Sequence, residues 1–145
     1  MSLDRAAIAA RIPHAGTMCL LDAVESWDET RALCRAASHR EPGNPLRSDD
    51  QLSALNAIEY GAQAMAVHAS LLGADAGKPA PGYLVAIRDV EFFTDRLDDR
   101  AQNLSVLAER IHGDAHGLQY AFSVRAGDSE LARGRLTARI GVTPA

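Results

Sequence analysis

The sequence predicts an α+β protein in which an antiparallel β-sheet wraps around one long central helix. Residues 53–72 form a long stretch that is rich in alanine and free of proline, and a glycine stop follows at Gly73. The segments on both sides of this stretch alternate apolar and polar residues with the period of two that is typical of strands. Strands gathered around a single helix indicate the α+β class, with the sheet packed on the helix.

The length of 145 residues predicts one domain over residues 1–145. Hydrophobic residues make up 47% and charged residues 23% of the chain, which excludes wholesale disorder. The net charge of −4 argues against a protein that binds nucleic acid through a basic surface.

The N-terminal residues and the cysteines favour a soluble cytoplasmic protein. Asp4 and Arg5 precede any apolar run, and no uncharged apolar stretch is long enough to span a membrane. Cys19 and Cys34 form neither a CxxC pair nor a zinc-type spacing, and both fall in expected strands. We therefore expect reduced, buried thiols, no membrane contact and no metal.

Three elements and one long loop are expected before the central helix. Residues 3–11 have a weak helical pattern. Residues 18–27 and 30–37 are strands that a polar turn joins into a hairpin. Residues 40–51 are rich in Pro, Gly, Asn and Asp and form a loop of a length that is often functional.

Four strands are expected after the helix, over residues 83–93, 104–108, 118–126 and 136–142. The first of them is long and apolar. As the edge of a monomer's sheet it would invite pairing with another chain, so we expect a dimer in which the sheets of two protomers join.

Glu59 is the residue of the central helix that most needs an explanation. It is the only formal charge between Asp50 and Asp75, in a helix that is apolar on all sides and is therefore expected to be buried. Burial raises the pKa of a carboxyl group, which suits a general acid. The alternatives are that Glu59 pairs with an arginine or that this end of the helix is exposed.

Two further polar residues lie on the same helix. Gln63 follows Glu59 by four residues and shares its face, so its amide can bond the carboxylate or a substrate. A core glutamine with satisfied hydrogen bonds is the alternative. His68 lies more than two turns beyond Glu59 and is interpreted as structural.

Two histidines outside the helix are candidate bases. His14 precedes the first strand, and His39 lies between the second strand and the long loop. The sequence has no GxSxG, HExxH, GxGxxG or phosphate-binding GxxxxGK[ST] motif. The enzymatic chemistry that remains is acid–base catalysis by a carboxyl and an imidazole, without a cofactor.

Two segments carry a resemblance to a known family. Pro13-His-Ala-Gly-Thr-Met-Cys-Leu-Leu-Asp22 resembles the Pro-His…Leu-Leu-Val-Asp opening of the bacterial 3-hydroxyacyl-acyl carrier protein dehydratases. Ala57-Ile-Glu-Tyr-Gly-Ala-Gln-Ala-Met65 resembles their helix motif, Ile-Glu-(three residues)-Gln. The resemblance covers residues 8–142 and is nearest to the divergent aryl-polyene (ApeP-like) branch. It implies the hotdog fold and a dimer.

The resemblance also implies a reaction and a set of site residues. A 3-hydroxyacyl thioester on acyl carrier protein would lose water to give the trans-2-enoyl thioester, in fatty-acid or polyene-type lipid biosynthesis. An imidazole would remove the C2 proton, and Glu59 would protonate the departing hydroxyl. Pro13 and Gln63 would contact the substrate. In the family the Pro-His segment lines the acyl tunnel, which favours His14 as the base.

His39 is the alternative base. The family's catalytic loop histidine lies in Gly-His-Phe-Pro, whereas His39-Arg-Glu-Pro42 lacks the glycine and the phenylalanine. A non-catalytic hotdog subunit of a heteromeric dehydratase and an acyl-CoA thioesterase are the rival functions, and the Pro-His opening argues against the thioesterase.

The implied partners are acyl carrier protein and a second subunit. The second subunit would be a copy of this chain or another dehydratase. Because the carrier protein is acidic, some of five arginines are expected to form its docking patch. These are Arg88, Arg96, Arg100, Arg133 and Arg135.

Overall fold

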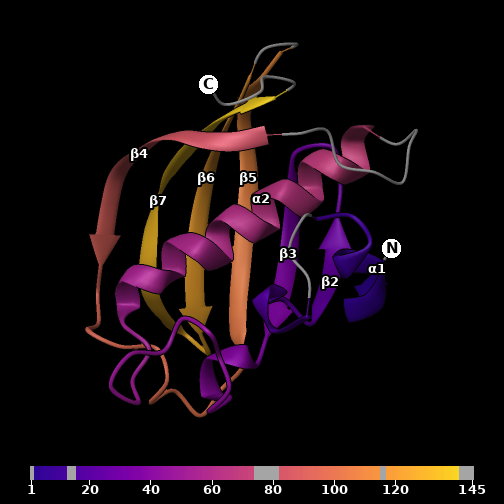
Figure 1. The fold of residues 1–145 in the computed structure, drawn as a ribbon. Coiled ribbons are helices and arrows are strands. Elements are labelled where there is room, and N and C mark those ends of the chain that lie inside the picture. The colour runs from indigo at the N-terminus through magenta and orange to yellow at the C-terminus, as the bar shows by residue number, and fades with distance from the viewer. Residues whose placement is uncertain (1, 13–15, 74–81, 115–116, 141–145) are drawn as a thin grey trace.

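The described residues form a seven-stranded antiparallel sheet that curves around one long helix, the architecture that the sequence predicts with six of these strands (Figure 1). The structure is a computed structural model, which describes residues 2–12, 16–73, 82–114 and 117–140. The strand order is β1-β2-β3-β5-β6-β7-β4. The elements are β1 (Leu3–Asp4), α1 (Arg5–Ala9), β2 (Ala23–Trp27), β3 (Arg31–Ala36), α2 (Ala57–Gly73), β4 (Gly82–Phe92), β5 (Leu104–Gly113), β6 (Gly117–Ala126) and β7 (Ser129–Ile140), with short 3₁₀ turns at Gly16–Met18, Ser38–Arg40 and Ala54–Asn56.

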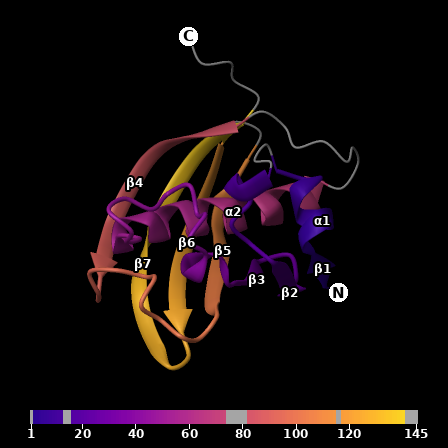
Figure 2. The ribbon, with the colours of Figure 1, turned by 60° about the horizontal axis from the view of Figure 1, so that its bottom comes forward.

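The helix α2 lies in the hollow of the sheet and packs on β3, β5, β6 and β7 (Figure 2). The hydroxyl of Ser53 accepts a hydrogen bond from the amide of Leu55 at the turn that leads into it. Gly61 allows the close approach to β6, because a Cβ there would lie 2.6 Å from the ring of Phe122. The missing side chain thus sets the depth at which the helix lies.

The described residues bury only one face of α2, so the prediction of a helix buried on all sides is wrong for this part of the single chain. Tyr60, Gln63, Ala64, Val67 and Leu71 are among the buried residues. The opposite face is formed by Ile58, Glu59, Ala62, Ala66 and Ala69, which are partly or fully accessible. A curved sheet covers only one side of a helix, and the apolar pattern of a helix does not state which side is covered.

The segment before β2 differs from the expected strand over residues 18–27, because the strand begins only at Ala23. The carbonyl of Met18 and the amide of Leu20 bond the side chain of Gln63 and therefore make no strand ladder. The predicted hairpin is confirmed, since β2 pairs with β3 in antiparallel register. The carboxylate of Asp28 accepts hydrogen bonds from the amides of Thr30 and Arg31 in its turn.

Two other boundaries also differ. The helix expected over residues 3–11 is shorter, because Asp4 caps α1 by accepting a hydrogen bond from Ala7 at 2.9 Å. The strand expected over residues 136–142 begins earlier, at Ser129, directly after the turn at Gly127. Residues 141 and 142 lie outside the described residues.

The strand β4 is the edge of the sheet, as expected for residues 83–93. Leu84, Ile87 and Phe92 lie opposite residues of β7 that face the helix, so their side chains share that face. They are nevertheless 36%, 48% and 41% exposed. The chain thus leaves an apolar strip of sheet uncovered, and the dimer remains a prediction.

Candidate active site

Glu59 lies in the first turn of α2, at the end of the helix that lies beside β4 (Figures 1 and 2). Its side chain is exposed, so the expectation of a buried carboxyl is wrong for the single chain and the exposed alternative holds. Within the described part of the chain the carboxylate makes no hydrogen bond or ion pair. Ile58 and Ala62 beside it are apolar. A carboxylate with free oxygens thus stands at the margin of an apolar surface.

Gln63 is buried, and its side-chain amide forms hydrogen bonds with the backbone of a neighbouring segment. Its Oε1 accepts a hydrogen bond from the amide of Leu20 at 2.8 Å, and its Nε2 donates to the carbonyl of Met18 at 2.6 Å. It forms no hydrogen bond with Glu59, so it is the satisfied core glutamine. The segment that it holds follows Pro13 and His14 in the sequence, and those two residues lie outside the described residues.

Tyr60 connects α2 to two other segments through a buried chain of hydroxyls. Ser38 donates to the carbonyl of Leu20 at 2.7 Å, so the Tyr60 hydroxyl, also 2.7 Å from Ser38 Oγ, donates to Ser38. The Tyr60 oxygen accepts in turn from Asn44 at 3.3 Å. Burial raises the pKa of Tyr60, so the phenol stays neutral. Sequence reasoning missed this residue, although it adjoins Glu59.

His39 is completely buried in the turn that follows β3. Its Nε2 lies 3.0 Å from the carbonyl of Arg100 and must donate to it, which leaves the lone pair on Nδ1. Nδ1 makes no hydrogen bond to any described residue. Burial lowers the pKa of His39, so the ring stays neutral near pH 7. Its protonation state suits a base, but its enclosure keeps a substrate away.

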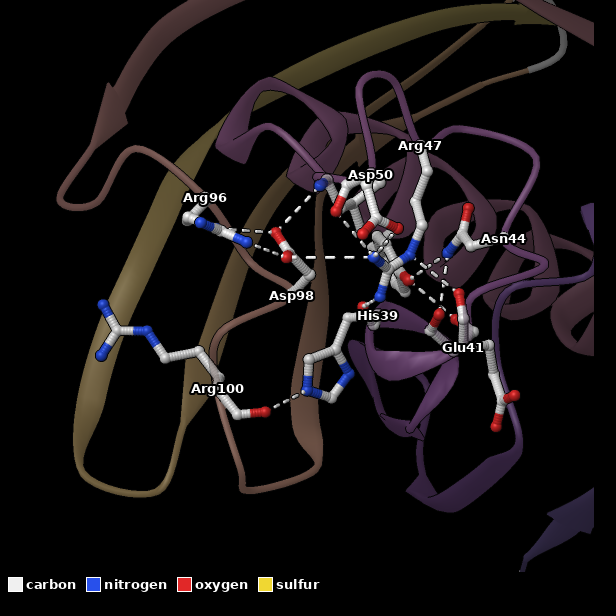
Figure 3. A network of polar contacts seen from close by, with 11 residues as sticks. His39, Glu41, Asn44, Arg47, Asp50, Arg96, Asp98 and Arg100 are labelled. Carbon is white, nitrogen blue, oxygen red and sulfur yellow. Dashed lines mark hydrogen bonds and ion pairs between the residues drawn. The ribbon is translucent and has the colours of Figure 1, made fainter.

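A charged cluster around Arg47 and Asp98 surrounds the His39 turn (Figure 3). Arg47 donates to three backbone carbonyls of the long loop, those of His39, Glu41 and Asp50. Its guanidinium lies 3.9 Å from the carboxylate of Asp98. The sequence analysis assigned no role to either residue, because nothing in the local pattern indicates that the two loops meet.

His68 has the structural role predicted for it. It is completely buried between α2 and β6. Nε2 donates to the carbonyl of Asp28 at 2.7 Å, and Nδ1 accepts from the hydroxyl of Tyr120 at 2.5 Å. Because both nitrogens are engaged, the ring supports the core and has no free atom for catalysis.

A pocket of about 310 Å³ adjoins the Tyr60 chain, with Thr17, Asp22, Ser38 and Asn44 among its lining residues. Asp22 in it is paired with Arg5 at 3.3 Å. Arg5, Asp22 and Glu41 bring formal charges to this lining, whereas an acyl chain needs an uncharged apolar surface such as that along β4.

Neither a metal site nor a membrane span is found in the parts of the chain that the structure covers. No group of three or more His, Cys, Asp or Glu side chains there is arranged to hold a metal ion. None of the helices among those residues has both the length and the hydropathy to cross a bilayer.

A single helix held in a curved antiparallel sheet defines the hotdog fold, and solved structures agree. The matching structure with a TM-score of 0.80 belongs to the dehydratase heterocomplex ApeI:P from Xenorhabdus doucetiae, at 21% identity over 92% of this chain and 90% of that one. AziG from S. sahachiroi matches with a TM-score of 0.61, at 15% identity over 81% of this chain and 88% of that one.

A third matching structure is of a protein with a different name, a hypothetical thioesterase. A hypothetical thioesterase with coenzyme A from Streptococcus pneumoniae TIGR4 matches with a TM-score of 0.60, at 10% identity over 84% of this chain and 87% of that one. At these identities the likeness shows the fold alone. No curated protein matches the chain by sequence.

The family follows from the sequence itself. The ApeP-like family model, described as ApeP dehydratase, matches residues 6–140. The chain belongs to this family of dehydratases.

Proposed function

We propose that this protein removes water from 3-hydroxyacyl thioesters on acyl carrier protein to give the trans-2-enoyl thioesters, in fatty-acid or polyene-type lipid biosynthesis. The observation that carries the proposal is Glu59, the only formal charge between Asp50 and Asp75. Its carboxylate has no partner among the described residues and stands beside an uncovered apolar surface. That environment suits a group that meets its proton acceptor only when substrate binds.

The reaction needs one base and one acid. The base takes the C2 proton, and the electrons of that C–H bond form the C2=C3 double bond. The C3–O bond breaks as Glu59 donates its proton, so the hydroxyl leaves as water.

We assign the base to His14, with His39 as the alternative. His39 has no exposed surface, and its Nε2 is bonded to the carbonyl of Arg100. The segment after His14 is held against α2 by Gln63, one turn beyond Glu59. Met18 and Leu20, which Gln63 bonds, follow His14 by four and six residues in the sequence. Pro13 and Gln63 would then shape the acyl site, Gln63 by fixing the segment that it bonds.

The uncovered surface of β4 supports a dimer, made with a second copy of this chain or with another dehydratase subunit. The ApeI:P structure is a heterocomplex of dehydratases, which favours the second kind of partner. Leu84, Ile87 and Phe92 would be covered in such an assembly, and an acyl chain could lie beside them.

The acyl carrier protein would dock through arginines, and Arg88 is the one of the five whose charge is not paired with a described carboxylate. Arg96, Arg100, Arg133 and Arg135 each lie within 4 Å of a carboxylate of this chain. Arg88 is exposed, and no described carboxylate pairs with it. Because paired charges attract a partner less, we expect Arg88 to contribute most to docking.

A second candidate function is that of a non-catalytic subunit in a heteromeric dehydratase. The complete enclosure of His39 favours it, because this histidine is where the family resemblance expects a base. Thioesterase activity has no such observation of its own, since the thioesterase neighbour shares only the fold.

The deciding experiment is a dehydration assay on 3-hydroxyacyl-acyl carrier protein of several chain lengths. The purified chain is assayed alone and with a co-expressed hotdog dehydratase, and the enoyl thioester is followed by its absorbance. We expect turnover that is lost when Glu59, His14 and His39 are replaced together. Turnover that occurs only in the mixture and survives the triple replacement would identify the chain as the non-catalytic subunit.

A further inference from the structure

We infer that Asp98 is a positioning residue, which fixes the start of α2, and with it Glu59, relative to the loop that carries His39. The inference rests on the proposed role of Glu59. It concerns two segments that are far apart in the sequence, the loop over residues 37–52 and the loop over residues 93–103, which meet in Figure 3.

Asp98 reaches the start of the helix through Leu52. Its Oδ1 accepts a hydrogen bond from the amide of Leu52 at 2.9 Å. Two backbone bonds continue this contact, from Leu97 to the carbonyl of Leu52 at 2.8 Å and from Ala54 to the carbonyl of Asp95 at 2.9 Å. The chain then runs without a break through the 3₁₀ turn Ala54–Asn56 into α2. A shift at Leu52 would therefore move the first turn of the helix.

The same carboxylate also holds the His39 loop, through Arg47. Arg47 Nη1 lies 3.9 Å from Asp98 Oδ2, while Nη2 donates to the carbonyl of His39 at 3.2 Å. His39 is fixed on its other side by the carbonyl of Arg100 at 3.0 Å. Among the described residues, Asp98 is thus the charged group that both bonds the amide of Leu52 and pairs with the guanidinium of Arg47, which organises the His39 loop.

The negative charge of Asp98 strengthens both attachments. Its side chain is only 5% exposed. Arg96 binds it through two nitrogens, Nε and Nη2, and this pairing is the main reason that the pKa of Asp98 lies far below its usual range. The carboxylate therefore stays ionised at any pH at which the protein works. An asparagine keeps the shape and one acceptor but loses the attraction to both arginines.

Asp99 provides a matched control. It adjoins Asp98, but its side chain is 49% exposed, and its ion pair within the described part of the chain is with Arg100 at 3.6 Å. The pair of variants Asp98→Asn and Asp99→Asn therefore removes the same charge from adjacent positions, once inside the junction of the two loops and once outside it.

The experiment combines hydrogen exchange with kinetics on the co-expressed assembly. In Asp98→Asn we expect amide exchange at least about tenfold faster in both residues 40–51 and residues 52–56, with β5 and β6 unchanged. We expect kcat to fall about 10–100-fold with KM within about threefold, because a displaced acid slows the chemical step. Asp99→Asn should match the wild type in amide exchange and in kcat and KM.

The outcomes separate this inference from the proposed function. If the wild type has no dehydratase activity, the proposed function fails, and the exchange data alone decide the role of Asp98. Faster exchange confined to the Leu52 amide, or a normal kcat in an active Asp98→Asn enzyme, would overturn the inference. If Asp98→Asn does not fold, Arg96→Gln replaces it, and equal exchange in Arg96→Gln and wild type would overturn the inference in the same way.

Discussion

The polar side chains on the two faces of α2 differ in burial and in hydrogen bonding. On the face toward the sheet, Tyr60, Gln63 and His68 are buried, and each is hydrogen-bonded within the chain. On the open face, Glu59 has no partner among the described residues. A buried polar group without a hydrogen-bond partner lowers stability by about 1–3 kcal/mol. The polar groups on the buried face therefore need hydrogen-bond partners within the chain. The open face was under no such constraint, and its lone carboxylate is available for chemistry.

The comparison also explains how an apolar helix can be only half covered. The neighbours of Glu59 on the open face are Ile58 and small alanines, which give the sequence the appearance of a core helix on every side. The uncovered apolar strip of β4 lies beside the same end of the helix (Figure 1). The described residues of this chain cover neither of these two apolar surfaces.

The largest expected effect is at Glu59. Glu59→Gln should lower the dehydration rate about 10²–10⁴-fold, because the amide cannot donate the proton that the leaving hydroxyl needs. The denaturation midpoint should stay at the wild-type value, since the side chain is exposed. Glu109→Gln, an exposed carboxyl on β5, is the matched control and should leave the rate unchanged. A Glu59→Gln enzyme with the wild-type rate would remove Glu59 from the mechanism.

Replacing His14 should lower the reaction rate, whereas replacing His39 should lower the stability of the fold. His14→Ala should cost about 10²–10⁴ in rate, the contribution of a general base. His39→Ala should mainly lower the free energy of unfolding, by about 1–3 kcal/mol, because it removes a buried ring and leaves the Arg100 carbonyl without its donor. Urea denaturation and initial rates on both variants test this. A rate loss seen only in His39→Ala would make His39 the base.

A smaller effect is expected where the buried face touches the sheet. Gly61→Ala should lower the free energy of unfolding by about 1–3 kcal/mol, because its Cβ would collide with the ring of Phe122. Gly73→Ala is the control, since a Cβ at that helix end meets nothing within 4 Å. Thermal denaturation compares the two. Equal stability would show that the helix can move away from β6 without cost.

The smallest effect is the pH dependence of stability. Burial lowers the pKa of His39 and of His68 below the ordinary 6.5, so the unfolded chain takes up protons more readily than the folded one. Their contribution to stability is therefore complete above about pH 6.5 and is lost as the pH falls below it. Urea midpoints at pH 8 and pH 5.5 should show the decrease. His68→Gln should show a smaller decrease, and an identical one would exclude His68 from the effect.

Local patterns predicted some features well and others poorly, for reasons that particular residues show. The long helix and the edge strand β4 follow the expected spans, since periodicity is a property of neighbouring residues. The strand expected from residue 18 failed because Gln63, more than 40 residues away, takes the backbone groups of Met18 and Leu20. Asp98 was missed because its partner Leu52 lies 46 residues away, with no local motif at either position.

The sequence by itself determined the α+β class, the central helix, the succession of six strands along the chain and the lone charge at Glu59. These depend on residue type and spacing along the chain, which the sequence states directly. Only the tertiary structure decided that Glu59 faces outward while His39 is enclosed. It also decided that β4 keeps an apolar face uncovered. Burial depends on which distant segments cover a residue, and that coverage arises only when the sheet closes over one side of the helix.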